Sequence, residues 1–418
     1  MRTMTSAIPR AWRTPAVVMI CGSVVVLLNF GIKASFGLFL KPMSTDLGWG
    51  REIFAFAMAL QNLLMGAFMP FTSAVAEKWG SGRVVASGSL IYALGLFIMS
   101  EATSPISFYM SGGMLIAVGL SGSGLGLVLG VVSRSVSPER RSWALGIVTA
   151  AGSIGQLTMV PVGQAFLSQY GWSRAFFLLG ICALVILPMA LALTGHTNRA
   201  SERNEQSLGE ALGEARRHSG FLFLTAGFFV CGFHVAFISV HLPAHLTDVG
   251  LPATLGAWAL SIIGLTNIFG SITSGVLGGK WSKKSLLSYI YSARSATILL
   301  FIIGPHYMGK FFGFVPRNTL SVLVFAAIMG ILWLSTVPLT SGLVAQIFGP
   351  RYMATLFGIT YFSHQVGSFA GVWLGGYLFD ETGSYLAMWW LAVALGLLAA
   401  LLHMPIDERT VSRLTAAE

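Results

Sequence analysis

The amino-acid sequence predicts an all-α integral membrane protein, with twelve transmembrane helices in two pseudo-symmetric six-helix bundles. Three observations predict this fold class. The chain of 418 residues is 55% hydrophobic and only 10% charged, whereas a soluble domain carries about 25% charged residues. Its apolar runs are continuous rather than alternating, which indicates helices and argues against a barrel. The two halves of the chain also repeat short motifs at nearly constant spacing.

The predicted spans follow one another along the chain with short polar breaks between them. A helix needs about 20 mainly apolar residues to cross a bilayer. In the first half such windows lie at 15–40, 51–76, 84–100, 107–131, 142–168 and 174–194. In the second half they lie at 220–246, 253–279, 285–305, 318–346, 353–379 and 384–404. We expect no cleaved signal sequence, because the first window is too long for one.

The longest polar break divides the chain into two bundles. We expect an N-terminal bundle over 1–194, a linker over 195–219, a C-terminal bundle over 220–405 and a tail over 406–418. Within the linker, Ser207 followed by Glu210 matches a capping box. This pair predicts a short amphipathic helix that ends near Arg217 and lies on the inner membrane surface.

The distribution of basic residues predicts the orientation. Of the 25 Lys and Arg residues, 18 fall in the termini and loops on the side of the N-terminus, and 5 fall in the loops on the other side. This bias places both termini in the cytoplasm of a plasma (inner) membrane protein. The net charge of +10 therefore reflects topology, and we expect no nucleic-acid partner.

Two motif pairs relate the halves. SAVAEKWGSGR (73–83) resembles GVLGGKWSKK (275–284), and GIVTAAGSIG (146–155) resembles GITYFSHQVG (358–367). The second pair has an offset of 212 residues, which also relates Gly171 to Gly383. Duplicated six-helix units are typical of rocking transporters, whose substrate site lies near the membrane midplane between the halves.

These motifs resemble the major facilitator superfamily. The segment 73–83 is similar to the cytoplasmic signature loop of that family, with Glu77 as its acid and Lys78 and Arg83 as bases. The stretches SRSVSPERRSWALGIVTAAGSIG (133–155) and FGLFLKPMSTDLGW (36–49) resemble its monocarboxylate-porter-like branch. The resemblance implies an inner gate that is latched when the site faces out, formed by Glu77, Lys78, Arg83, Arg134 and Arg140. Topogenic charges on solvated loops are the alternative.

Two cations lie inside predicted spans, at Lys33 and Arg294, whereas no acidic residue lies at mid-membrane. An intramembrane charge is costly and usually faces a cavity or a partner. We therefore expect an anionic substrate bound by Lys33, with Asn29 one helical turn away on the same face. Snorkelling of Lys33 toward the outer surface, or a neutral lysine, are the alternatives.

Four further residues are candidates for the substrate site. Arg294 acts as a second cation or binds backbone carbonyls, and Tyr291, one turn away, shares its ligand or holds it in place. Trp333 stacks on the substrate or packs in the core, and Asn267 is the polar candidate of the eighth span.

His234 and His241 are the candidates for proton coupling, because histidine titrates near neutral pH and no buried carboxylate is available. A structural interhelical bond is the alternative for each. The cysteines Cys21, Cys182 and Cys231 fall within spans. They complete no zinc ligand set with the histidines, so we expect no metal and no cofactor.

The combined prediction is a monomeric secondary transporter of a small organic anion, a monocarboxylate by resemblance, that works by proton symport and alternating access. We expect no enzymatic activity, since no nucleophile and base form a set. Two alternatives remain open. One is an exporter of amphipathic or drug-like compounds, and the other is a membrane sensor of the same fold that does not transport.

Overall fold

The helices of the protein lie where the sequence predicts its spans. The computed structural model describes residues 12–137, 140–194, 207–312, 319–349 and 352–411. The remaining parts of the predicted linker and tail lie outside the described residues.

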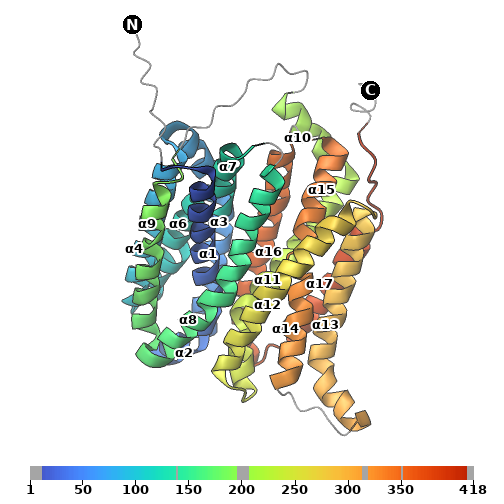
Figure 1. Cartoon of the computed structure of the whole chain (residues 1–418). Helices are drawn as coiled ribbons and strands as arrows, with labels where there is room; N and C mark the ends of the chain where they lie inside the picture. Colours follow the sequence, from blue (N-terminus) through green and yellow to red (C-terminus); the bar gives the residue numbers. More distant parts are fainter. Residues whose placement is uncertain (1–11, 138–139, 195–206, 313–318, 350–351, 412–418) are drawn as a thin grey trace.

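Eleven helical segments make up the N-terminal half of the described chain (Figure 1). They are α1 (Pro15–Ala34), the 3₁₀ turn η1 (Phe36–Phe39), α2 (Leu40–Leu47), α3 (Arg51–Trp79), α4 (Ser81–Ser100), α5 (Pro105–Phe108), the π-helical η2 (Tyr109–Leu115), α6 (Ile116–Ser123), α7 (Leu125–Ser135), α8 (Arg141–Leu184) and α9 (Ile186–Ala190).

After the linker helix, seven helices form the described C-terminal half. The linker helix is α10 (Leu208–Arg217), and the others are α11 (Ser219–Asp248), α12 (Ala253–Gly278), α13 (Lys283–Phe312), α14 (Thr319–Leu332), α15 (Thr336–Phe348), α16 (Met353–Thr382) and α17 (Leu386–His403). The predicted capping box is confirmed, since Ser207 Oγ accepts from Glu210 N at 3.3 Å and Glu210 Oε2 accepts from Ser207 N at 2.7 Å.

Ten segments of the described chain are both long and apolar enough to cross a membrane. One of these, Trp143–Ala190, holds two predicted spans, because α8 turns at Gly171, where φ is 77° and ψ is 174°. The eleventh predicted span is α16, a 30-residue helix whose central polar residues lower its hydropathy. Every predicted window is therefore helical. Hydropathy applied to the structure's helices merges two of the predicted spans into one segment and misses α16.

The duplication predicted from the motifs is visible in the backbone. Gly171 and Gly383, which share the 212-residue offset, both end a long helix with positive φ, at 77° and 67°. The same offset relates Ser123 to Ser335, and each marks an interruption in a membrane-spanning segment, between α6 and α7 and between α14 and α15. The windows gave no sign of these two interruptions.

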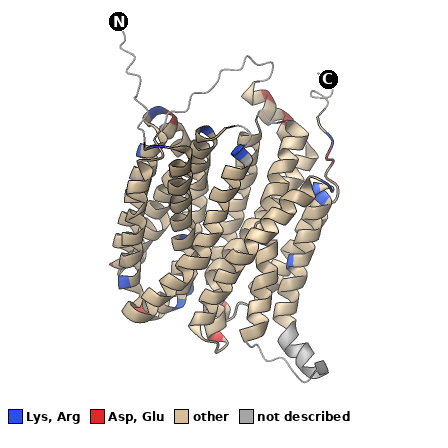
Figure 2. Cartoon of the chain, in the orientation of Figure 1, with Lys and Arg blue, Asp and Glu red and all other residues tan. Residues whose placement is uncertain are grey.

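The two ends of the bundle differ in charge. We call the end that carries α10 the linker end, and the other the opposite end (Figure 1). The first and last described residues lie at the linker end, where Lys and Arg gather and acidic residues lie on α10, whereas fewer basic residues lie among the acidic ones at the opposite end (Figure 2).

Candidate substrate site and gates

Lys33 lies in the last turn of α1 and reaches across to α3. Its half-buried ammonium group donates to the Asn62 amide oxygen at 2.9 Å and approaches the Met65 sulfur at 3.7 Å. An ammonium has three N–H donors, so one is left over from these two contacts. In the described part of the chain, no carboxylate pairs with Lys33. The site therefore presents a cation whose charge no described protein group neutralises.

Asn29 caps the interruption between α6 and α7. Gly124 is extended there, with φ −72° and ψ 170°, so the helical hydrogen bonds stop after Ser123. The Asn29 amide donates to the Ser123 carbonyl oxygen at 2.7 Å and to its hydroxyl at 3.2 Å. A carbonyl at a helix end lacks an intrahelical partner, and Asn29 supplies one. Asn29, one helical turn from Lys33 on α1, thus holds the end of α6 in place. Its role as a substrate ligand stays a prediction.

Arg294 performs the same task at the second interruption. Its guanidinium donates twice to the Leu332 carbonyl oxygen, at 3.0 and 2.6 Å, and once to that of Trp333. Its side chain is fully buried within the C-terminal bundle, and Tyr291 lies beneath it with the ring centroid 5.3 Å from the guanidinium carbon. Because the carboxyl end of a helix carries partial negative charge, the end of α14 offsets the charge of Arg294.

Asn267 joins the second interruption to the other bundle. Its amide oxygen accepts from Leu334 N at 3.0 Å, and its amide nitrogen donates to Ser153 Oγ of α8 at 3.0 Å. Trp333 lies within the interruption and is only 3% exposed. These contacts fit core packing for Trp333 and a bridging role for Asn267.

The two intramembrane cations therefore belong to different environments. Lys33 bonds within the N-terminal bundle, whereas Arg294 bonds to backbone oxygens inside the C-terminal bundle. No shared partner among the described residues brings them together. The geometry fits one candidate cation for a substrate, Lys33, and a structural role for Arg294 and Tyr291.

The candidate histidines differ in what they contact. His234 Nε2 lies 2.8 Å from the Ala392 carbonyl oxygen of α17, which is an interhelical bond within one bundle. His241 Nε2 lies 2.8 Å from the Val372 carbonyl oxygen, and its Nδ1 lies 3.0 Å from the Tyr385 hydroxyl. The hydrogen bonds of His241 therefore connect it through the Tyr385 side chain to the opposite end, whereas His234 bonds only to a backbone oxygen among the described residues.

At the opposite end an ion-pair cluster joins the two bundles. Arg51 of α3 forms a bidentate pair with Asp248 of α11, at 2.6 and 2.8 Å, and Lys41 pairs with Asp248 at 2.9 Å. Close by, a Cβ atom at Gly37 would overlap the Ser239 carbonyl oxygen. Sequence reasoning missed this cluster, because Arg51 and Asp248 are 197 positions apart.

A second acid strengthens the same contact. Asp380 of α16 accepts from the backbone N–H groups of Arg51 and Glu52 at 2.9 and 2.8 Å, which caps the start of α3. Glu52 accepts from Trp373 Nε1 at 2.9 Å. Carboxylates at a helix amino terminus are stabilising. The opposite end is therefore closed by hydrogen bonds and ion pairs between the bundles.

At the linker end the predicted gate residues are not paired with one another. Glu77 and Lys78 are exposed at the end of α3, and neither bonds to Arg83, Arg134 or Arg140 in the described part of the chain. Among described residues, no hydrogen bond or ion pair joins this part of α3, or α7, to the C-terminal half. An inner gate formed by these residues stays a prediction for the state in which the site faces out.

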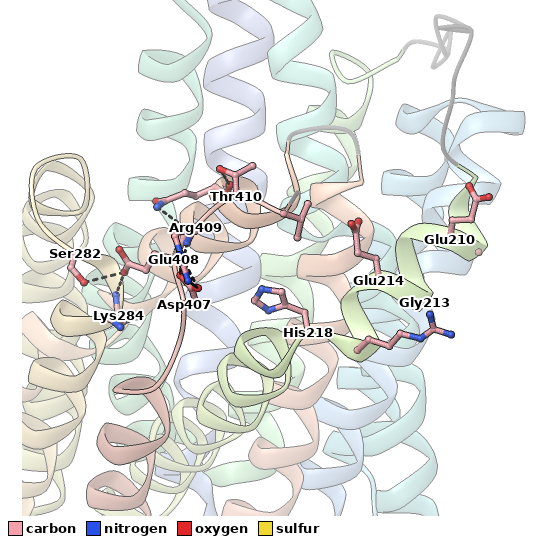
Figure 3. Close-up of a pocket in the computed structure, with 14 residues that line it drawn as sticks. Glu210, Gly213, Glu214, His218, Ser282, Lys284, Asp407, Glu408, Arg409 and Thr410 are labelled. Atoms are coloured by element: carbon pink, nitrogen blue, oxygen red, sulfur yellow. Dashed lines mark hydrogen bonds and ion pairs between the residues drawn. The ribbon is translucent and has the colours of Figure 1, made fainter. Parts of the chain in front are cut away.

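The last described segment, 407–411, is docked on the linker end of the C-terminal bundle (Figure 3). Glu408 accepts from Lys284 N at 2.6 Å and from Ser282 Oγ at 3.1 Å, and Val411 N donates to the Ile347 carbonyl oxygen at 3.0 Å. A groove of about 1690 Å³ separates this segment from α10. Lys33 does not line this groove.

Arg409 and Asp407 also pair with each other within this segment. Hydrogen bonds from Arg409 lower the pKa of the Asp407 carboxyl to about 2. This carboxyl therefore stays ionised at physiological pH.

Comparison with known proteins identifies the family of the chain. The sequence model described as Major Facilitator Superfamily matches residues 20–372. Monocarboxylate transporter 13 of Rattus norvegicus is 27% identical over 376 residues, covering 86% of this chain and 81% of that protein. Monocarboxylate transporter 11 of Homo sapiens is 26% identical over 397 residues, covering 91% and 80%. The uncharacterized MFS-type transporter YcxA of Bacillus subtilis (strain 168) is 25% identical over 365 residues, covering 85% and 86%.

A solved structure agrees on the fold. The crystal structure of a D-xylose-proton symporter superposes with a TM-score of 0.70, covering 95% of this chain and 99% of that chain at 14% identity. At that identity the likeness concerns the fold alone. The matched range, the full-length relatives and the duplicated six-helix architecture agree, so the chain belongs to the Major Facilitator Superfamily and is a transporter related to monocarboxylate transporters.

Proposed function

We propose that this protein carries a small organic anion, a monocarboxylate, across the plasma membrane together with a proton. Lys33 is the observation that carries the proposal. It is a cation at the carboxyl-terminal end of α1 with one donor left over and no described carboxylate beside it. A substrate carboxylate supplies the missing counter-charge and a strong charge-assisted hydrogen bond.

The two interrupted spans support an anion as well. Asn29 and Arg294 cap the negative carboxyl ends of α6 and α14. The half-helices α7 and α15 begin at these interruptions without a side-chain cap, and a helix amino terminus is its positive end. In transporters such half-helix termini favour anionic substrate groups near the midplane.

The orientation follows from the charge bias. The linker end carries the excess of Lys and Arg, which we take as cytoplasmic, with both termini inside. The structure is closed at the opposite end and lacks a described latch at the linker end. In this proposal it is therefore the inward-facing state of an alternating-access cycle. The names of the curated relatives point to a monocarboxylate as the substrate.

Uptake into liposomes tests the proposal. We expect purified wild-type protein to accumulate members of a radiolabelled carboxylate panel when an inward proton gradient is applied, and less without the gradient. Lys33→Ala removes a charge-assisted bond worth roughly 2 kcal/mol, so the apparent KM is expected to rise at least about tenfold.

Lys280→Ala is the matched control, because Lys280 is an exposed lysine in a loop at the linker end. It is expected to behave as wild type. Equal uptake by wild type and Lys33→Ala assigns Lys33 a structural role. No uptake of any acid by folded wild-type protein contradicts the proposal and favours export of amphipathic compounds.

A further inference from the structure

His241 is buried where α11, α16 and the start of α17 meet, and both ring nitrogens have partners. Nε2 lies 2.8 Å from the Val372 carbonyl oxygen, which can only accept a hydrogen bond. Nε2 must therefore carry a hydrogen. In the neutral ring Nδ1 then accepts, and its partner is the Tyr385 hydroxyl at 3.0 Å.

The Tyr385 hydroxyl connects this ring to the ion-pair cluster between the bundles. It accepts from Arg51 Nη1 at 3.0 Å and donates its own hydrogen to His241 Nδ1. The same Arg51 group donates to Asp248 at 2.6 Å. One assignment of hydrogens thus satisfies every contact from Asp248 to Val372, and it requires a neutral His241.

A second proton on His241 would break this arrangement. Nδ1–H would face the Tyr385 oxygen, whose own hydrogen would then need another acceptor. The two 3.0 Å bonds that meet at Tyr385 also hold His241 Nδ1 within about 6 Å of the Arg51 guanidinium, so two cations would face each other. Both effects disfavour the closed contact.

We propose that His241 is a proton-binding site that controls the opposite end of the transporter, acting through Tyr385 on the Arg51–Asp248 pair. Its protonation opens that end, and closure of that end expels the proton. By linkage, acid outside the cell favours the outward-facing state. The link to external acid rests on the proposed function and orientation.

A cavity adjoins the Asp248 and Tyr385 end of the network. A cavity of about 280 Å³ at the opposite end is lined by His245, Asp248 and Tyr385, among others. His245, also of α11, packs against the Tyr385 ring with a centroid distance of 5.9 Å. The other ionisable groups of the cluster are Lys41 of α2, Arg51 and Glu52 of α3, and Asp380 of α16.

The position of the two bundles at the opposite end can be measured without any substrate. We would place spin labels at Thr45→Cys on α2 and Thr254→Cys on α12, both exposed, after replacing Cys21, Cys182 and Cys231. The distance between the two labels would be measured by pulsed electron–electron double resonance, with the protein in nanodiscs at pH values from 8 to 5.5. This window covers the ordinary range of histidine and stays above that of carboxyl groups.

We expect the population with the long distance to grow several-fold as the pH falls. His241→Gln, which stays neutral, is expected to keep the short distance at every pH. His245→Gln is the matched control, since His245 also lines the cavity and lies one turn away, and it is expected to retain the full response. A wild type without a pH response, a response that persists in His241→Gln, or one lost in His245→Gln overturns the proposal.

Tyr385→Phe provides a second route if His241→Gln does not fold. It keeps the ring that packs against Phe237 and Phe379 but removes the connecting hydroxyl. The proposal requires a weakened pH response in this variant, and an unchanged response contradicts it. Failure of carboxylate uptake would refute the proposed function but leave these distances unaffected, so the two ideas fail separately.

Discussion

Two cations of one membrane protein, Lys33 and Arg294, show that partner atoms decide what a buried charge does. Arg294 faces carbonyl oxygens at the end of α14, and the guanidinium fork fits two of them at once. Lys33 faces one amide oxygen and one thioether, which leave its charge available. The first arrangement completes the fold, and the second has the properties of a binding site.

At the residue scale, Arg294→Gln is expected to destabilise the protein without a specific effect on substrate affinity. The change removes the donors for Leu332 and Trp333 and leaves buried carbonyls unpaired. The loss is on the order of 2 kcal/mol, since each unpaired buried group costs about 1–3 kcal/mol. Thermal unfolding in detergent, followed by tryptophan fluorescence, should show a lower Tm.

The matched control for Arg294→Gln is Arg174→Gln, which removes an exposed arginine near the opposite end of the other bundle. It is expected to leave the Tm unchanged. A raised KM for Arg294→Gln at an unchanged Tm would contradict the structural role and indicate that Arg294 binds the substrate.

The sequence identified the charged residues within spans but not their partners. Lys33 and Arg294 look alike in a hydropathy profile, because both interrupt apolar runs. Their roles differ through contacts that span 29 and 38 positions along the chain. His234 and His241 are likewise equivalent by spacing, and only the three-dimensional neighbours Ala392 and Tyr385 distinguish them.

At the element scale, the 3₁₀ turn η1 itself packs against α11 at the opposite end. Gly37 lies in this turn, and a Cβ there would overlap the Ser239 carbonyl oxygen and lie 3.0 Å from Val240 Cα. Both obstacles are backbone atoms, which cannot move aside as a flexible side chain can. The close approach of these two elements therefore requires glycine.

Gly37→Ala is expected to hold the opposite end apart and to slow the transport cycle. Overpacking typically costs about 1–3 kcal/mol, so turnover should fall roughly tenfold, measured as initial uptake rate. Gly146→Ala is the control, because a Cβ there meets nothing within 4 Å. If Gly37→Ala transports as fast as Gly146→Ala, the contact between η1 and α11 is not part of the cycle.

At the scale of the whole molecule, ion pairs and hydrogen bonds join the two bundles at the opposite end, and among the described residues no ion pair joins them at the linker end. The groups that join them come from α2, α3, α11 and α16, so both halves of the duplication contribute. Because Asp248 receives both Arg51 and Lys41, it is the acid whose loss should most weaken the closed end.

Asp248→Asn is expected to open the opposite end more often. The change removes two ion pairs, and a cysteine placed at Val240, which is 7% exposed, should become more reactive. A shift of about 1.4 kcal/mol corresponds to tenfold faster labelling by a membrane-impermeant maleimide. Asp46→Asn is the control, since Asp46 bonds to Trp172 within the same bundle. Equal labelling in both variants would show that the ion pairs do not keep this end closed.

Sequence reasoning predicted the molecule's architecture more fully than its gates. Span positions and the duplication follow from composition and repeated motifs, and Gly171 and Gly383 both have positive φ at the end of a helix. The interruptions at Gly124 and at 333–335 do not show in the hydropathy windows, because both stretches are uncharged. The contact of Arg51 with Asp248 depends on how two bundles meet, which local patterns do not encode.

The polar character of α16 has a consequence for how the protein is made. A helix enters the bilayer from the translocon according to its hydrophobicity, and α16 is the 30-residue helix that is not among the ten apolar segments of the described chain. Its Ser363 bonds to the Thr225 carbonyl oxygen of α11, and its Gln365 to the Asn62 carbonyl oxygen of α3. During biosynthesis α16 should therefore insert efficiently only beside helices already synthesised, and poorly when tested alone in an insertion assay.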